Sequence, residues 1–188
     1  MKNARGQAMV EMAVVLPLVM IILLGVVEVS YALLEQHVVT KLTREGSNLI
    51  SRDTSLQDAS LALRNMSTRP VNFATSSKMI FSVIKRVPTA GSANFDKPVL
   101  YQRYEYGSIP GASAIGTRGG GSFGGAPEYI ANNSDNDTNL QITNLPANII
   151  APGGMLYVTE VFTRHTLITP FDKFGVTVPN TLYSIAYF

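Results

Sequence analysis

Residues 12–34 read MAVVLPLVMIILLGVVEVSYALL and contain a single charged residue, Glu28. As a helix this stretch is about 35 Å long at 1.5 Å per residue, and the hydrocarbon core of a bilayer is about 30 Å thick. A helix that is apolar on every face needs either lipid or a large protein around it. A chain of 188 residues does not supply a large protein. The stretch therefore predicts one transmembrane helix.

Two basic residues in front of this stretch raise an alternative and also set the orientation. Lys2 and Arg5 resemble the n-region of a secretory signal, but the apolar run exceeds the usual h-region of roughly 7 to 15 residues. No small-x-small cleavage site follows it. The same two residues favour a cytoplasmic N-terminus, and a long C-terminal domain is translocated largely regardless of its charge. We expect the chain after about Leu34 to lie outside the cytoplasm.

Composition excludes several classes of function. The net charge is only +2 and the basic residues are scattered, so no nucleic-acid partner is expected. The absence of cysteine excludes disulfides, thiolate zinc sites and thiol nucleophiles. His37 and His165 are the only histidines and fall on different predicted elements, so each is expected to be an ordinary surface or strand residue. We identify no catalytic constellation, no metal site and no cofactor site, and do not expect an enzyme.

The motif that precedes the apolar run is Arg5-Gly6-Gln7-Ala8-Met9-Val10-Glu11. It resembles the processing signal of type IV prepilins, in which a membrane peptidase cuts after a glycine and the fifth residue of the mature chain is glutamate. The resemblance implies cleavage between Gly6 and Gln7, which makes Glu11 that fifth residue. Pro17, Gly25, Glu28 and the continuation to Arg44-Glu45 are similar to TadE/TadG-like proteins of tight-adherence pilus systems. The similarity is strong over about residues 5–52.

The physical chemistry of Glu11 agrees with such a role. An acidic residue at the centre of a transmembrane helix costs about 2.5 to 3.5 kcal/mol on insertion scales, so a partner or snorkelling must offset the cost. The α-amine freed on a neighbouring subunit by cleavage is such a partner, and the pair would fix the axial stagger between helices. The alternative is that Glu11 only marks the boundary at which the membrane helix begins.

Two further residues of the helix are candidates for a role in assembly. Pro17 lacks a backbone donor and leaves the carbonyl of Ala13 without its helical partner, so we expect a bend or a locally opened turn there. Glu28 lies inside the apolar run, near its exit. It either snorkels to the outer interface or faces a partner, and the sequence does not decide between the two.

The remaining chain predicts an α+β head. Helical spacing of apolar residues continues to about Ile50, and Ser55 with Asp58 predicts the N-cap of a second short helix that ends before Arg69-Pro70. Four segments rich in β-branched and aromatic residues predict an antiparallel sheet of about four strands. They are residues 78–87, 100–106, 155–165 and 182–188. The linker 166–181, with Pro170 and Pro179, is too long for a tight hairpin, so the strand order stays open.

A long insertion, residues 107–154, contains GTRGGGSFGGAP and ANNSDNDTN. We expect a flexible loop, with contact to a partner as the alternative. Asp135, Asp137 and Asn139 alternate as a calcium loop begins, but Leu140 stands where an EF-hand needs glycine and Pro146 where it needs glutamate. An EF-hand is thereby excluded, and a solvated turn is expected in its place, with a looser oxygen-ligand site as the alternative.

These observations predict four segments: a prepilin leader, 1–6; a transmembrane and assembly helix, 7–34; an extramembrane helical stem, 35–69; and a β-rich exported head, 70–188. The resemblance implies a minor pilin or pseudopilin of the bacterial inner membrane, with its head periplasmic or extracellular. Its expected partners are the membrane, a prepilin peptidase, other pilin subunits and an inner-membrane assembly platform. One alternative is a single-span envelope protein whose head binds a ligand without joining a filament. Another is a membrane-anchored hydrolase.

Overall fold

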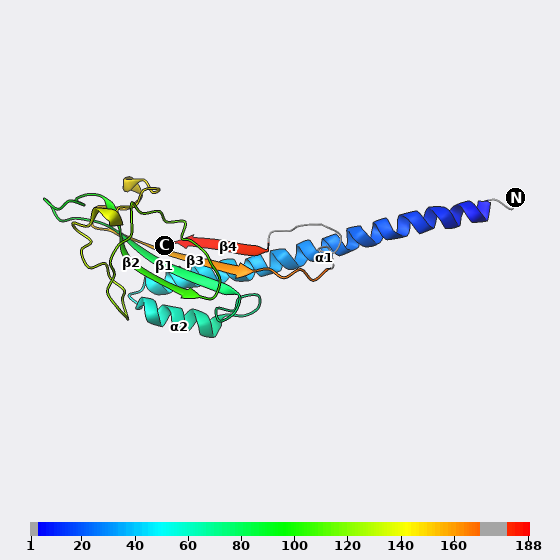
Figure 1. Cartoon of the computed structure of the whole chain (residues 1–188), viewed down its shortest axis with the longest axis horizontal. Coiled ribbons are helices and arrows are strands. Elements are labelled where there is room, and N and C mark those ends of the chain that lie inside the picture. Colours follow the sequence, from blue (N-terminus) through cyan, green and yellow to red (C-terminus); the bar gives the residue numbers. More distant parts are fainter. Residues whose placement is uncertain (1–3, 170–179) are drawn as a thin grey trace.

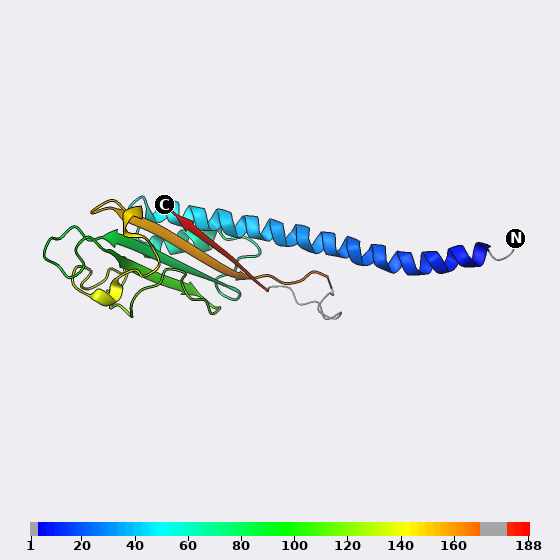
Figure 2. The same cartoon turned by 90° about the horizontal axis from the view of Figure 1, so that it is seen from above.

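The computed structural model describes residues 4–169 and 180–188. It consists of one very long helix, α1 (Ala4–Ile50), and a head at the C-terminal end of that helix. Figure 1 shows α1 projecting from the head as a long arm that ends at the N-terminus. Pro17 lies inside α1 without interrupting it, and the helix is gently curved in Figure 2.

The head contains a second helix, α2 (Leu56–Met66), which begins as expected at Ser55. The Ser55 hydroxyl accepts a hydrogen bond from the Asp58 backbone N–H at 3.1 Å and donates one to the Asp58 carboxylate at 2.8 Å. This N-cap satisfies a backbone donor at the start of the helix and orients α2. The predicted N-cap is therefore confirmed.

Four antiparallel strands form one sheet: β1 (Ser77–Arg86), β2 (Pro98–Gly107), β3 (Met155–Arg164) and β4 (Thr181–Tyr187). Their order is β2-β1-β3-β4, so the two central strands are far apart in sequence. The α+β class, the long apolar helix and the four-stranded sheet are all confirmed, with strand ends within two residues of the expected ones. Pro170 and Pro179 of the β3–β4 linker lie outside the described residues.

The two faces of the sheet carry separate apolar cores. On one face, α1 and α2 pack on β1 and β3 through buried side chains that include Val39, Leu42, Leu63, Phe81 and Val161. On the other face, the insertion between β2 and β3 covers the sheet with Ile115, Leu140, Ile142 and Ile150. The sheet is therefore the middle layer of three.

The insertion is a folded layer, which corrects the expectation of a flexible loop. It pairs with β2 through isolated bridges, Val99 with Gln141 and Gln102 with Ile130. Asn94 in the β1–β2 connection is fully buried, and its side chain donates to the carbonyls of Ser134 and Asp137 at 2.8 and 2.9 Å. Glycine-rich composition suggested flexibility, but apolar and amide side chains spread along the insertion supply the contacts that fix it.

Candidate functional site: the N-terminal helix and its junction with the head

The N-terminal part of α1 has no cover. Every residue from Gly6 to Leu23 is exposed, and most of them are large and apolar. Within the described residues, α1 is the one helix long and apolar enough to cross a membrane. Residues 6–27 measure about 33 Å at 1.5 Å per residue, close to the roughly 30 Å of a hydrocarbon core. The first buried residue along the helix is Glu28.

The expected processing site lies in the first turns of this bare segment. A Cβ added to Gly6 would have no atom within 4 Å, so Gly6 makes no packing contact with the rest of the chain. The Gln7 side-chain amide donates to the Glu11 carboxylate at 3.1 Å, one helical turn away. Glu11 itself is exposed. Lys2 of the expected leader lies outside the described residues.

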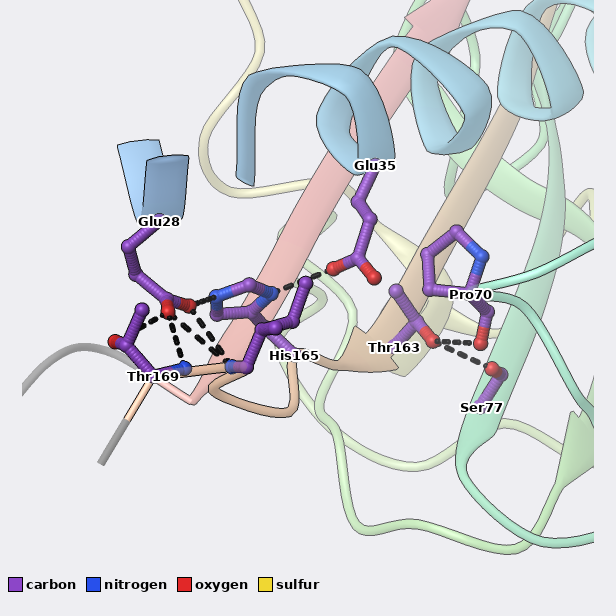
Figure 3. Close-up of polar contacts among 8 residues, drawn as sticks. Glu28, Glu35, Pro70, Ser77, Thr163, His165 and Thr169 are labelled. Carbon is purple, nitrogen blue, oxygen red and sulfur yellow. Dashed lines mark hydrogen bonds and ion pairs between the residues drawn. The ribbon is translucent and has the colours of Figure 1, made fainter. Parts of the chain in front are cut away.

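Glu28 faces the head of its own chain. Its carboxylate accepts hydrogen bonds from the Thr169 hydroxyl at 2.6 Å and from the backbone N–H groups of Thr169 and Ile168 at 2.9 and 3.2 Å. His165 Nε2 lies 3.2 Å from the same carboxylate. Figure 3 shows these donors converging on Glu28 from the segment that follows β3. Neither snorkelling nor exposure to a partner is needed to satisfy this carboxylate.

Glu35, two helical turns beyond Glu28, completes the junction. Its carboxylate lies 2.5 Å from His165 Nδ1, so the imidazole sits between two acids of one helix (Figure 3). A neutral imidazole carries one N–H and can donate to only one carboxylate. Hydrogen bonds to both acids need a second proton, either on the other ring nitrogen or on a carboxyl group that then donates to it. The imidazole thus links Glu28 and Glu35 of α1 to the end of β3.

The burial of His165 corrects the expectation that it is an ordinary surface or strand residue. It follows the last residue of β3 directly and is only 5% exposed. The sequence carried one signal for the junction: Glu28 and Glu35 are seven residues apart, which places both on one side of a helix. Their partner could not be identified, because His165 lies 137 residues after Glu28. His37 is exposed, as expected.

Asp135 and Asp137 of the insertion both accept hydrogen bonds from other groups of the chain. The Asp137 carboxylate accepts from the Asn139 backbone N–H at 3.0 Å as the N-cap of a short 3-10 helix (Thr138–Leu140). The Asp135 carboxylate accepts from the Thr89 hydroxyl at 2.7 Å. These bonds use the oxygens that a cation would need, and no group of metal-binding side chains is found among residues 4–169 and 180–188.

A second buried acid, Glu160 of β3, ties the insertion to the sheet. It accepts hydrogen bonds from the Ser113 hydroxyl, from the Ala114 backbone N–H at 2.7 Å and from the Tyr183 hydroxyl at 2.8 Å. Burial raises the pKa of Tyr183, and the bond to Glu160 raises it further. Tyr183 therefore remains a donor at neutral pH. The hydrogen bonds of Glu160 thus hold the insertion and β4 against β3, which is a structural role.

The sequence model of the TadE-like protein family matches residues 6–48. This segment of the chain is similar to that family. The match includes Gly6, Gln7, Glu11 and Pro17, and it continues through the junction residues Glu28 and Glu35. It supports the pilin and membrane character inferred from the motif.

No curated protein matches the chain, and no solved structure does. The TadE-like match thus covers the long helix alone and ends before α2 and the sheet begin.

Proposed function

We propose that this chain is a minor pilin or pseudopilin of a tight-adherence-type pilus or a related secretion filament. The observation that carries the proposal is the unequal cover of one TadE-like helix, with residues 6–27 bare and apolar and the rest packed on a folded head. A helix of this kind is stable when lipid or the helices of other subunits surround its bare part.

The contacts of Glu28 with the head support a membrane surface located next to this residue. The backbone N–H groups of Ile168 and Thr169 lie against α1 at Glu28. Backbone polar groups are excluded from hydrocarbon, because moving them out of water costs free energy. The lipid-embedded part therefore ends near Val27, seven residues before the boundary expected from hydropathy. The N-terminus is cytoplasmic, and the head lies on the periplasmic or extracellular side of the inner membrane.

Maturation and assembly follow from the first turns of α1. A prepilin peptidase cleaves between Gly6 and Gln7, and the freed amine of one subunit pairs with Glu11 of its neighbour. The exposure of Glu11 supports this role, because its one side-chain hydrogen-bond partner in the described chain, Gln7, is neutral. An inner-membrane assembly platform and other pilin subunits are the partners of the matured chain. Pro17, on the same bare segment, lies where it contacts lipid or neighbouring helices.

A single-span envelope protein that binds a ligand without joining a filament is the second candidate. The same bare helix would serve as its anchor, so cleavage at Gly6 distinguishes the two. The hydrolase alternative has less support, because both ring nitrogens of His165 lie against carboxylates. Neither nitrogen is then free to take a proton from a substrate.

The N-terminal residue of the mature protein tests the proposal. Mass spectrometry of membrane and sheared-filament fractions should find a chain that begins at Gln7, and only when the prepilin peptidase is present. A chain that retains Gly6 in both fractions would favour the anchor. The peptidase-deficient strain is the control, because it keeps the membrane and the head unchanged.

A further inference from the structure

A groove of about 920 Å³ opens at the end of the head that faces the bare segment of α1. Its walls are α1 from Tyr31 to Val38, the connection between α2 and β1, and the segment that follows β3. Figure 1 shows these three pieces at the side of the head from which the bare helix emerges. The groove therefore lies next to the point where α1 leaves the head.

The charge of the groove is positive. Arg69 and Arg164 line it and are exposed. No ion pair links either guanidinium to a carboxylate within the described part of the chain. Glu35 is the one acid among the lining residues, and it lies against His165. Two guanidinium groups that have no carboxylate partner among the described residues, beside one engaged acid, attract an anion.

The side of the groove nearest the bare helix is apolar and exposed. Leu34 is 59% exposed and Ile168 54% exposed. If hydrocarbon ends near Val27, Tyr31 stands about 6 Å and Leu34 about 10 Å above it along the helix. The headgroup layer of a leaflet is about 5 to 7 Å thick, and an arginine side chain extends its charge well beyond its own Cα. The groove therefore opens into the headgroup layer.

We propose that this groove binds the phosphate of an anionic membrane phospholipid such as phosphatidylglycerol. Arg69 and Arg164 donate to the phosphate oxygens, because a guanidinium group matches phosphate with two parallel N–H donors. Ile168, whose backbone N–H bonds to Glu28 directly after Val27, lies beside the first carbons of the acyl chains. The inference rests on the proposed membrane insertion, and it identifies lipid as a ligand of the head as well as of the helix.

The chain has no tryptophan, so the variant Ile168→Trp introduces a single reporter. Ile168 contributes its backbone N–H to Glu28 and its side chain is exposed, so the junction is retained. The full chain is reconstituted in equal mixtures of phosphatidylcholine and phosphatidylglycerol, with bromine on the acyl chains of one lipid or the other. Stronger quenching by the brominated phosphatidylglycerol is the expected result.

Variants of the two arginines distinguish a specific phosphate site from general electrostatic attraction to an anionic membrane. General attraction to an anionic surface is worth about fivefold per basic residue, lysine or arginine alike, and each arginine of a built site should contribute more than this. Arg69→Gln with Arg164→Gln should remove the preference, and Arg69→Lys with Arg164→Lys should reduce it to the general level, since lysine keeps the charge without the paired donors. Arg52→Gln, an exposed arginine beyond the C-terminal end of α1, should leave it unchanged. Full preference in the lysine variant would overturn the site.

Other occupants predict different outcomes. Loss of the preference on adding inorganic phosphate would assign the groove to free phosphate. Loss on diluting the protein in lipid would assign it to a second copy of the chain. Equal quenching by both lipids in a chain that inserts and is cleaved at Gly6 would refute the lipid site alone and leave the pilin proposal standing. Failure to insert would refute both.

Discussion

The two parts of α1 differ in what surrounds them, although the helix runs without interruption from Ala4 to Ile50. Residues 6–27 are apolar and almost uncovered, and residues 28–50 alternate between buried and exposed positions against the sheet. Both parts are therefore helical, but they need different surroundings. The bare part needs lipid or other subunits, and the packed part already has its partner within the chain.

The two glutamates of these parts show the same difference. Glu11 is exposed and has only the Gln7 amide beside it. Glu28 is buried, with hydrogen bonds from three donors of Ile168 and Thr169 and a contact with His165. One carboxylate remains available to a neighbour, and the other fixes the head on the helix. Mutations in the two parts should consequently affect different measurements.

The largest effect is expected at Gly6. Gly6→Leu should abolish the chain that begins at Gln7, because a peptidase that accepts an extended leader with glycine before the cut has no room for a bulky side chain. The head should keep its melting temperature, since nothing packs on Gly6. Mass spectrometry of the N-terminus and a thermal melt of the same preparation measure both. A Gly6→Leu chain that still matures at Gln7 would exclude this processing site.

His165→Ala should destabilise the head by about 3 kcal/mol, the usual cost of leaving buried acids without their partner. His37→Ala is the matched control, because His37 is exposed although it lies on the part of α1 that packs on the head. Urea unfolding of both variants measures the difference. Equal stability of the two variants would mean that the junction does not hold the head on α1.

Gly46→Ala should cost about 2 kcal/mol by overpacking. A Cβ at this position would lie 2.7 Å from the Thr159 methyl group and 3.0 Å from a Leu63 methyl group. Combining it with Thr159→Ala should recover part of the loss, which a double-mutant cycle would detect as coupling. Gly6→Ala, in the bare part, is the control and should leave the free energy of unfolding unchanged. Additive effects at positions 46 and 159 would argue against this close contact of α1 with β3.

The smallest effect is expected at Asp135, far from either part of α1. The Thr89 hydroxyl, which donates to its carboxylate, holds the pKa of Asp135 below its ordinary value. A lowered folded-state pKa gives stability that is present above the unfolded-state pKa of about 3.9 and lost as the pH falls through the folded-state value. Asp135→Ala should lower stability at neutral pH by about 1 kcal/mol or less.

The same variant should lose less stability on acidification than the unmutated chain does. Unfolding measured at neutral and acidic pH, with and without calcium, gives the comparison. A calcium-dependent rise in melting temperature that Asp135→Ala and Asp137→Ala abolish would show that the turn is a cation site after all.

Local patterns were enough to predict much of the fold. The uninterrupted apolar run predicted α1, Ser55 with Asp58 predicted the start of α2, and β-branched and aromatic segments predicted all four strands. Each of these signals lies within a few residues of the structure it specifies. The expected processing and assembly residues, Gly6, Gln7 and Glu11, also belong to one short motif.

Contacts between distant residues could not be predicted in the same way. The junction of Glu28 with His165 and the bonds of Asn94 to the insertion join segments more than forty residues apart. Their geometry depends on strand order, which the long β3–β4 linker left undetermined. The helix continues through Pro17 without a break, and the bend or locally opened turn expected there stays a prediction.

The exposed Glu11 carboxylate gives the most direct test of assembly by the bare part of α1. Glu11→Gln and Glu28→Gln each remove one acid from the same helix, in cells that contain the peptidase and the partner pilins. We expect Glu11→Gln to be cleaved at Gly6 and to keep a wild-type melting temperature, but to lose cross-linking and co-purification with partner pilins, because the amide lacks the charge that pairs with an amine. Glu28→Gln should be cleaved and have a lower melting temperature. Wild-type recovery of partner pilins from Glu11→Gln would show that Glu11 only marks the membrane boundary, and would contradict the assembly role.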